Sequence, residues 1–335
     1  MRFSLNPDYI RVSIGTAAVL GLVSMQLDAV PTTAYLMLYT TKHCRANCGF
    51  CPQARESQAR SDALSRIFWP QFSLEDVKRR FESSENVKSF KRICIQIINY
   101  ENFFKDLLGV INAFQEFKIP ISVSVQPLTE NQMKTLYQSG VSRIGIPLDA
   151  ATKTIFDQVK GKGMKSPYKW ETHLESIKMA QSIFGSKNVS THLIIGLGET
   201  ELDAIKFIET MIDSQVLPAL FTFTPVRGAS FENRSPPTLF HYRKIQLARY
   251  LLINNICQFR DFAFNEKGEL IKFGIPKDRL FEIIRTGKPF LTSGCSGCNR
   301  PFYNERPGTI LFNYPQQLTE EEIKQVTDLF EANMQ

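Results

Sequence analysis

Three cysteines, Cys44, Cys48 and Cys51, are spaced for metal chemistry. The pattern Cys-x3-Cys-x2-Cys places three thiolates on one short loop, enough to bind three irons of a four-iron four-sulfur cluster and leave one iron without a protein ligand. An iron with an open position can bind a small molecule and act on it. Zinc sites usually draw on two separated cysteine pairs, so zinc binding or chance clustering is the less favoured alternative.

A second pair of cysteines follows near the C-terminus, in the run Gly294-Cys295-Ser296-Gly297-Cys298. A Cys-Ser-Gly-Cys turn with flanking glycines brings two thiols to one metal centre and lets backbone N–H groups approach the sulfurs, as iron–sulfur loops do. Zinc binding or a redox disulfide of the Cys-x-x-Cys kind remains the alternative. Cys257 lies in an apolar helical pattern, where a small buried side chain is the commoner role.

The elements that would position these thiols alternate between strand and helix patterns. Six strands are expected at 35–40, 92–98, 119–125, 143–147, 191–196 and 220–224, with helices at 73–82, 103–117, 130–139, 170–184 and 201–214. Residues 261–264 and 290–291 are possible seventh and eighth strands. This rhythm predicts an α/β fold, a complete or partial (β/α) TIM-type barrel. Loops after the strands build the active site of such barrels, and the cysteine triplet follows the first strand.

Composition limits the remaining possibilities. A chain of 335 residues with 43% hydrophobic residues favours one barrel domain with additions: an N-terminal helical extension (1–34), the barrel (35–292) and a C-terminal cluster-binding segment with a helix (293–335). The apolar run 12–27 predicts a buried helix, because it is too short for a membrane span and lacks a cleavage pattern. Seven cysteines, an odd number, predict a reducing, cytoplasmic location. The net charge of +7 suits an acidic partner protein, and no nucleic-acid motif is present.

The triplet, with Phe50 before its last cysteine, resembles the signature of the radical S-adenosylmethionine (SAM) enzymes. That resemblance implies that the amino and carboxylate groups of SAM chelate the open iron. An electron from the cluster then cleaves SAM to a 5′-deoxyadenosyl radical, which removes hydrogen atoms from unactivated carbon. The protein's part is to bind, orient and shield the cofactor.

A narrower resemblance is to biotin synthase, and four runs carry it: 48–53, 128–132, 148–149 and 195–200. It implies that Asp149 hydrogen-bonds the SAM ribose and that the turn of Gly196, Gly198 and Glu199 approaches the adenine. It also matches Cys94 to the first of three strand cysteines that hold a second cluster in that family.

The chain departs from biotin synthase at the other positions of that second cluster. Ser122 and Ser190 align with the two remaining cysteines, and Asn265 falls near the arginine ligand. Pro147 replaces the asparagine that reads the ureido ring of the substrate, and proline has no side-chain donor or acceptor. A ureido substrate is therefore not expected.

The run from Gly294 to Pro307 resembles that of the archaeal two-component lipoyl synthases. This resemblance implies a lipoyl synthase subunit, with a sacrificial four-iron cluster at Cys94, Cys295 and Cys298 that gives up sulfide to a protein-bound octanoyl chain. The fourth ligand of this cluster would be Cys257, a serine, an arginine or none. Tyr303 and Arg306 would shape the site.

The same resemblance implies the partners: a second homologous radical SAM subunit, an octanoylated acidic carrier (a lipoyl domain or glycine cleavage H protein) and an electron donor such as ferredoxin. Neither nucleic acid nor a membrane is expected. The alternatives are biotin synthase itself, a single-cluster radical SAM enzyme that forms carbon–carbon bonds or rearranges its substrate, and a non-enzymatic iron–sulfur scaffold or electron-transfer subunit.

Overall fold

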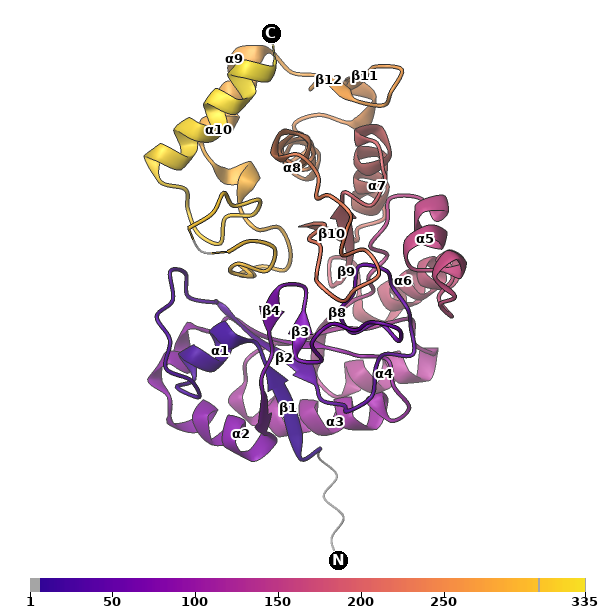
Figure 1. Ribbon diagram of the computed structural model, residues 1–335, viewed down its shortest axis with the longest axis vertical. Coiled ribbons are helices and arrows are strands. Elements are labelled where there is room, and N and C mark those ends of the chain that lie inside the picture. The colour runs from indigo at the N-terminus through magenta and orange to yellow at the C-terminus, as the bar shows by residue number, and fades with distance from the viewer. Residues whose placement is uncertain (1–6, 307, 335) are drawn as a thin grey trace, which may run out of the picture.

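A computed structural model describes residues 7–306 and 308–334 (Figure 1). Its main sheet has eight strands in the order β10-β9-β8-β7-β6-β2-β1-β5. The six strands from β10 to β2 run parallel and curve around an interior cavity. They are β2 (Thr33–Leu38), β6 (Arg92–Gln96), β7 (Ile121–Ser124), β8 (Val141–Gly145), β9 (Val189–Ile195) and β10 (Leu217–Thr222). The predicted (β/α) barrel is confirmed in its partial form.

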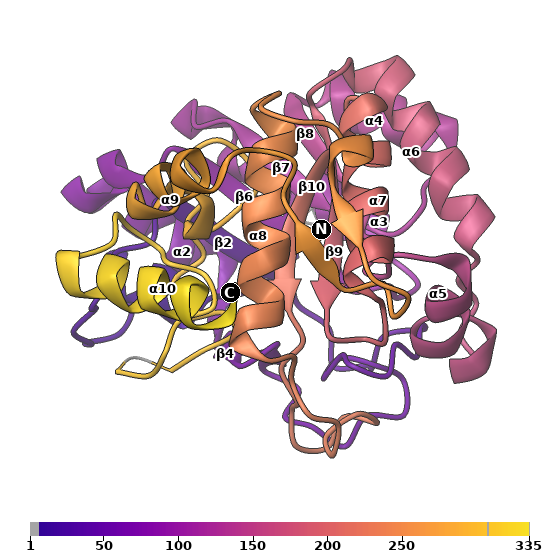
Figure 2. The same cartoon turned by 90° about the horizontal axis from the view of Figure 1, so that it is seen from above.

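Helices cover the outer face of this sheet, as Figure 2 shows. Along the chain they are α2 (Leu74–Ser83), α3 (Phe103–Phe114), α4 (Glu130–Gln138), α5 (Lys153–Val159), α6 (Trp170–Phe184), α7 (Glu201–Asp213) and α8 (Leu239–Ile253). Both α4 and α7 begin at a threonine, Thr129 or Thr200, whose hydroxyl accepts the N–H of the third helical residue. These caps fix where each strand-to-helix loop ends, and thus the geometry of the loops above the cavity.

The N-terminal region differs from the predicted helical extension. Strand β1 (Tyr9–Val12) comes first and pairs antiparallel with both β2 and β5 (Gln71–Ser73). The helix that follows, α1, is short (Ile14–Val19), because Ser13 caps its start and Gly21, at φ +67°, takes the left-handed conformation just after it. The apolar run therefore divides between a strand and one short helix.

The predicted seventh and eighth barrel strands were wrong. β11 (Ala263–Phe264) pairs only with β12 (Leu270–Lys272), in an antiparallel hairpin separate from the main sheet. Residues 288–290 form a 3-10 turn, and Leu291 makes a single bridge to Tyr314. Segments this short make too few ladder hydrogen bonds to extend a sheet. A further small hairpin joins β3 (Ala63–Leu64) to β4 (Ile67–Phe68).

The C-terminal segment occupies the gap between β2 and β10. It follows α9 (Lys277–Arg285), precedes α10 (Glu320–Asn333), and lies between the N-terminal strands and β10 in Figure 1. On one side Asn299 Oδ1 accepts the N–H of Thr32 at 3.0 Å, and on the other Asn304 Nδ2 donates to the carbonyl of Thr222 at 2.8 Å. Ring contacts such as Phe240–Phe330, at 5.5 Å between centroids, hold α10 on α8. The segment thus closes the side of an otherwise open barrel.

Among the described residues, no helix is both long enough and apolar enough to cross a membrane. The domain boundaries at 34/35 and 292/293 stay predictions.

Candidate active site in the barrel

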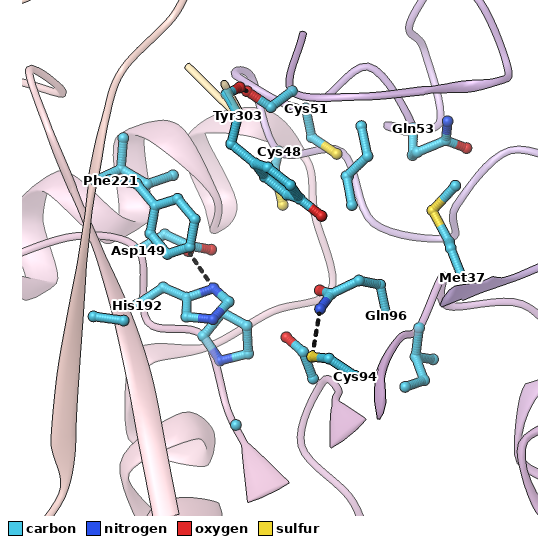
Figure 3. A pocket seen from close by; sticks show the side chains of 18 of the residues that line it. Met37, Cys48, Cys51, Gln53, Cys94, Gln96, Asp149, His192, Phe221 and Tyr303 are labelled. Carbon is cyan, nitrogen blue, oxygen red and sulfur yellow. Dashed lines mark hydrogen bonds and ion pairs between the residues drawn. The ribbon is translucent and has the colours of Figure 1, made fainter. Parts of the chain in front are cut away.

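The parallel strands enclose a cavity of about 280 Å³. Because side chains alternate along a strand, one face of each strand points into it: Cys94 and Gln96 from β6, Ser122 and Ser124 from β7, Arg143 and Gly145 from β8, and Ser190, His192 and Ile194 from β9. Figure 3 shows Cys48 and Cys51 on one side of this space and Cys94 on another. All six predicted cluster cysteines line the cavity, the other three being Cys44, Cys295 and Cys298.

The loop of the first cysteine set is anchored at several points. Cys44 donates its backbone N–H to the carbonyl of Gln53 at 3.0 Å, and Cys51 donates to that of Cys48 at 3.0 Å. At Gly49, a Cβ atom would lie 2.4 Å from the ring of Phe231, far inside van der Waals contact, so any larger residue would force the ring or the loop to move. Close packing of Phe231 on this loop explains why a glycine stands between Cys48 and the next thiol.

The first three thiols lie in an environment that disfavours the free thiolate. Burial raises the pKa of Cys44 and Cys48, and raises that of Cys51 to about 12. The ammonium of Lys160 opposes this rise at all three. Iron binding would replace the thiol protons and supply the missing positive charge.

Asp149 follows β8 with a left-handed backbone, at φ +67°. This conformation is costly for a residue other than glycine and is common at functional sites. It directs the carboxylate into the cavity, where Oδ2 accepts from Lys160 Nζ at 2.7 Å and Oδ1 lies 3.9 Å from His192 Nδ1. Burial lowers the pKa of His192 to about 4, so the imidazole is neutral at pH 7.

The predicted adenine turn forms directly after β9. Gly196 and Gly198 have φ values of +104° and +122°, and a Cβ on Gly196 would lie 2.6 Å from Pro237. The Glu199 carboxylate accepts the backbone N–H groups of Gly196 at 2.6 Å and Leu197 at 3.0 Å. Glu199 therefore stabilises its own turn, and none of the three predicted turn residues lines the cavity.

The second cysteine set lies where the C-terminal segment meets the barrel. Cys298 donates its N–H to the carbonyl of Cys295 at 2.9 Å, and its Sγ lies 3.3 Å from the hydroxyl of Tyr35 on β2. Cys94 accepts from Gln96 Nε2 at 3.1 Å. The pKa of Cys94 is raised to about 12, mainly by burial and in part by the nearby Cys295 and Cys298. Residues about 200 positions apart in the chain thus meet in one cavity.

The structure contradicts the hypothesis that Cys257 is the fourth ligand of the auxiliary cluster. It follows α8 and does not line the cavity, and its charged neighbours are Asp261 and Glu209. Tyr303 lines the cavity with a buried hydroxyl that lacks a hydrogen-bond partner in the described part of the chain. Arg306 is not among the cavity-lining residues.

The donor set fits polynuclear clusters. Within 7–306 and 308–334, no three His, Cys, Asp or Glu side chains converge as the ligands of a single metal ion. A four-iron cluster does not require that convergence, because each thiolate binds a different iron. The sequence analysis did not identify Lys160, Arg143 or His192 as site residues. Side chains alternate along a strand, so Arg143 shares a face with Asp149, and His192 shares a face with Ser190.

Residues 38–211 match the radical SAM superfamily, and this stretch is more than half of the chain. The chain belongs to the radical SAM superfamily. Membership implies that the protein is an enzyme and that its cofactors include one four-iron four-sulfur cluster and SAM.

Curated relatives are biotin synthases at low identity. That of Carboxydothermus hydrogenoformans is 24% identical over 203 residues, covering 58% of this chain and 58% of the relative. That of Aquifex aeolicus is 25% identical over 199 residues, covering 57% and 55%. The chain thus spans little more than half the length of these relatives.

Solved structures share the fold. The FeFe-hydrogenase maturase of Carboxydothermus hydrogenoformans superposes with a TM-score of 0.51 at 16% identity, covering 67% of this chain and 52% of that one. Methylornithine synthase superposes with a TM-score of 0.51 at 11% identity, covering 72% and 67%.

Proposed function

We propose that this chain is a lipoyl synthase subunit that inserts sulfur into a protein-bound octanoyl chain. The observation that carries the proposal is the second set of thiols, Cys94, Cys295 and Cys298, in the same cavity as the SAM-cluster loop. The first set would hold the SAM cluster, and the second would hold an auxiliary cluster that provides sulfide.

When bound, these groups supply the 5′-deoxyadenosyl radical and the sulfide. One electron from the donor would cleave SAM to methionine and the radical. The substrate C–H bond would then break as its hydrogen atom passed to the deoxyadenosyl carbon. A C–S bond would form to a sulfide as an Fe–S bond broke, and the one surplus electron would reduce the iron–sulfur group held by Cys94, Cys295 and Cys298. No general base is required, because a C–H bond of an alkyl chain is broken homolytically.

The cavity walls support an alkyl substrate. Met37, Ile98, Val125, Phe221 and Phe223 line the cavity together with the cysteines. Apolar walls would bind an octanoyl chain through the hydrophobic effect and keep water from the radical. The charged groups, Lys160 and Asp149 among them, would then orient SAM rather than the substrate.

Two features of the cavity lining depart from the expected biotin synthase site. Pro147 lines the cavity at the position where the resemblance to biotin synthase leads one to expect an asparagine. Ser122 and Ser190 also face the cavity, where the two-iron cluster of that family would need thiolates. Both features favour the octanoyl substrate over dethiobiotin.

The partners are part of this proposal. The chain has 40 Lys and Arg against 33 Asp and Glu, so an acidic carrier domain and an acidic electron donor such as ferredoxin would be attracted to it. Dithiolane formation needs two sulfur atoms, and a second homologous radical SAM subunit would insert the other one.

The first experiment measures iron and sulfide per chain after anaerobic reconstitution. The native protein is expected to hold about eight irons and the double variant Cys295→Ser, Cys298→Ser about four. Cys257→Ser is the matched control and should keep about eight, because Cys257 lies outside the cavity. About four irons in every sample would refute the auxiliary cluster and favour the single-cluster alternative.

The second experiment offers the reconstituted protein an octanoyl-lysine peptide or dethiobiotin, with SAM, a reductant and the homologous subunit. Mass spectrometry should find sulfur in the peptide and 5′-deoxyadenosine in parallel. Sulfur in dethiobiotin alone would identify a biotin synthase. A reduced protein that leaves SAM intact would be a scaffold or electron-transfer subunit.

A further inference from the structure

Arg143, on β8, faces the cavity without a partner for its buried Nε. This atom has no hydrogen-bond partner in the part of the chain that the structure describes. None of the ion pairs between the described residues includes Arg143. Arg143 as a whole is half-buried, but a buried N–H donor without a partner is costly, so this Nε is available to donate to a group bound in the cavity.

The register of the sheet places Arg143 in one row with an auxiliary thiol. Cys94 on β6 pairs with Ser122 on β7, and Ser122 pairs with Arg143 on β8. Adjacent strands lie about 4.8 Å apart, so β6 and β8 are separated by about 10 Å. All three side chains line the cavity. A group bound at Cys94 would therefore lie within reach of the long arginine side chain.

The charge of Arg143 acts on the second cysteine set from this position. Arg143 lines the same cavity as Cys295 and Cys298. Arg92, at the start of β6, donates to Ser142 Oγ at 2.8 Å, and its Nε is also buried without a partner among the described residues. Arg143 and Arg300 line the cavity together with the second cysteine set, so this part of the cavity carries positive charge.

The carboxylate that follows β8, Asp149, already has a partner. Asp149 binds Lys160 at 2.7 Å, and this buried pair lies beside the first cysteine set. Three positive side chains therefore line the cavity, Arg143, Lys160 and Arg300. Lys160 is paired with Asp149, whereas neither arginine takes part in an ion pair between the described residues.

We propose that Arg143 is a positioning residue for the auxiliary cluster, to whose sulfides its guanidinium donates N–H bonds and whose negative charge it offsets. The proposal rests on the proposed function, because it presupposes that Cys94, Cys295 and Cys298 hold a cluster. A four-iron cluster on three thiolates is anionic, and N–H donors around its sulfurs hold and tune it. Arginine suits this role better than lysine, since its planar fork donates to two acceptors at once.

The test isolates the auxiliary cluster in a background in which Cys44, Cys48 and Cys51 are all serine. In this background we compare Arg143, Arg143→Gln and Arg143→Lys, with Arg79→Gln as control because Arg79 is an exposed residue of α2 paired with Asp76. The readouts are iron per chain, the rate of iron loss to a chelator, and the electron paramagnetic resonance spectrum of the reduced cluster.

We expect Arg143→Gln to lose iron about 10- to 100-fold faster, as outer-shell variants of metal sites do. Arg143→Lys should be intermediate, and Arg79→Gln should match the background. Equal iron loss and an identical spectrum in Arg143→Gln would overturn the inference. If Arg143→Gln fails to fold by far-ultraviolet circular dichroism, a lysine variant identical to the background would overturn it. A background that binds no iron overturns the auxiliary cluster itself, and with it both proposals.

Discussion

Substituting Gly49 by alanine tests the geometry of the SAM-cluster loop independently of any substrate. A Cβ at position 49 would lie 2.4 Å from two ring atoms of Phe231, so ring or loop must shift by about 1 Å to restore a normal contact. Overpacking of this kind costs about 1 to 3 kcal/mol of unfolding free energy. Phe231 N–H also donates to the Gly49 carbonyl at 2.9 Å, which limits how far the two can separate.

The matched partner is Phe231→Leu, which removes part of the ring and costs about 1 to 2 kcal/mol through the small cavity it leaves. In the double variant the added methyl fills part of that cavity. The combined loss should therefore be smaller than the sum of the single losses by about 1 kcal/mol or more, a coupling typical of residues in contact.

The assay is urea denaturation of the apoprotein, followed by iron incorporation into each variant. Gly49→Ala should take up less iron at the first site, and the double variant should regain it. Strictly additive free energies, or a Gly49→Ala variant with unchanged stability and iron, would show that the ring does not pack on this loop as described.

Three further predictions follow from buried polar groups. Tyr35→Phe should lower the free energy of unfolding by about 1 to 3 kcal/mol, because the Tyr35 hydroxyl accepts a backbone N–H of the C-terminal segment at 2.9 Å. Tyr303→Phe should leave the stability unchanged, because the Tyr303 hydroxyl lacks a partner in the described chain. Thermal melts compare the two variants. Burial lowers the pKa of His173 from 6.5 to about 3. The unfolded state therefore binds the proton first as the pH falls, and the free energy of unfolding drops by about 2 kcal/mol between pH 7 and 5. In denaturant titrations, His173→Gln should reduce this dependence of stability on pH. Lys160→Met should lower the free energy of unfolding by about 3 to 5 kcal/mol, because it leaves the Asp149 carboxylate buried without a partner. Thermal melts of the double variant with Asp149→Asn should show that part of this loss is recovered.

The sequence was sufficient for the parallel strands and most of the helices, because buried strands and amphipathic helices leave periodic patterns. It failed for the end of the barrel. Phe290 and Leu291 are apolar enough to suggest a strand, yet Gly287 at φ +68° and Pro289 direct the chain into a 3-10 turn. The edge of β10 is instead covered by an irregular segment held by side chains such as Asn304, and such contacts have no period in sequence.

The site was predictable where function depends on spacing and unpredictable where it depends on packing. The spacing of Cys44, Cys48 and Cys51 identifies them in the sequence, and all three line the cavity together with Cys94, as expected. Lys160 lies in a lysine- and glycine-rich run that reads as exposed surface, yet its amine is buried on Asp149. Only the loop path after α5 reveals this, because nothing local distinguishes Lys160 from its exposed neighbour Lys162.

The C-terminal closure of the barrel has a consequence for the order of biosynthesis. A ribosome releases the cysteine loop after β2 and all six parallel strands before Cys295 and Cys298 emerge. A nascent chain could therefore load its first cluster while the lateral wall is still missing and the lumen is open to solvent. Under the proposed function, the second site would be complete only after Cys295 and Cys298 have been translated, so a product that stops before them would hold the thiols of the first cluster and only Cys94 of the second set.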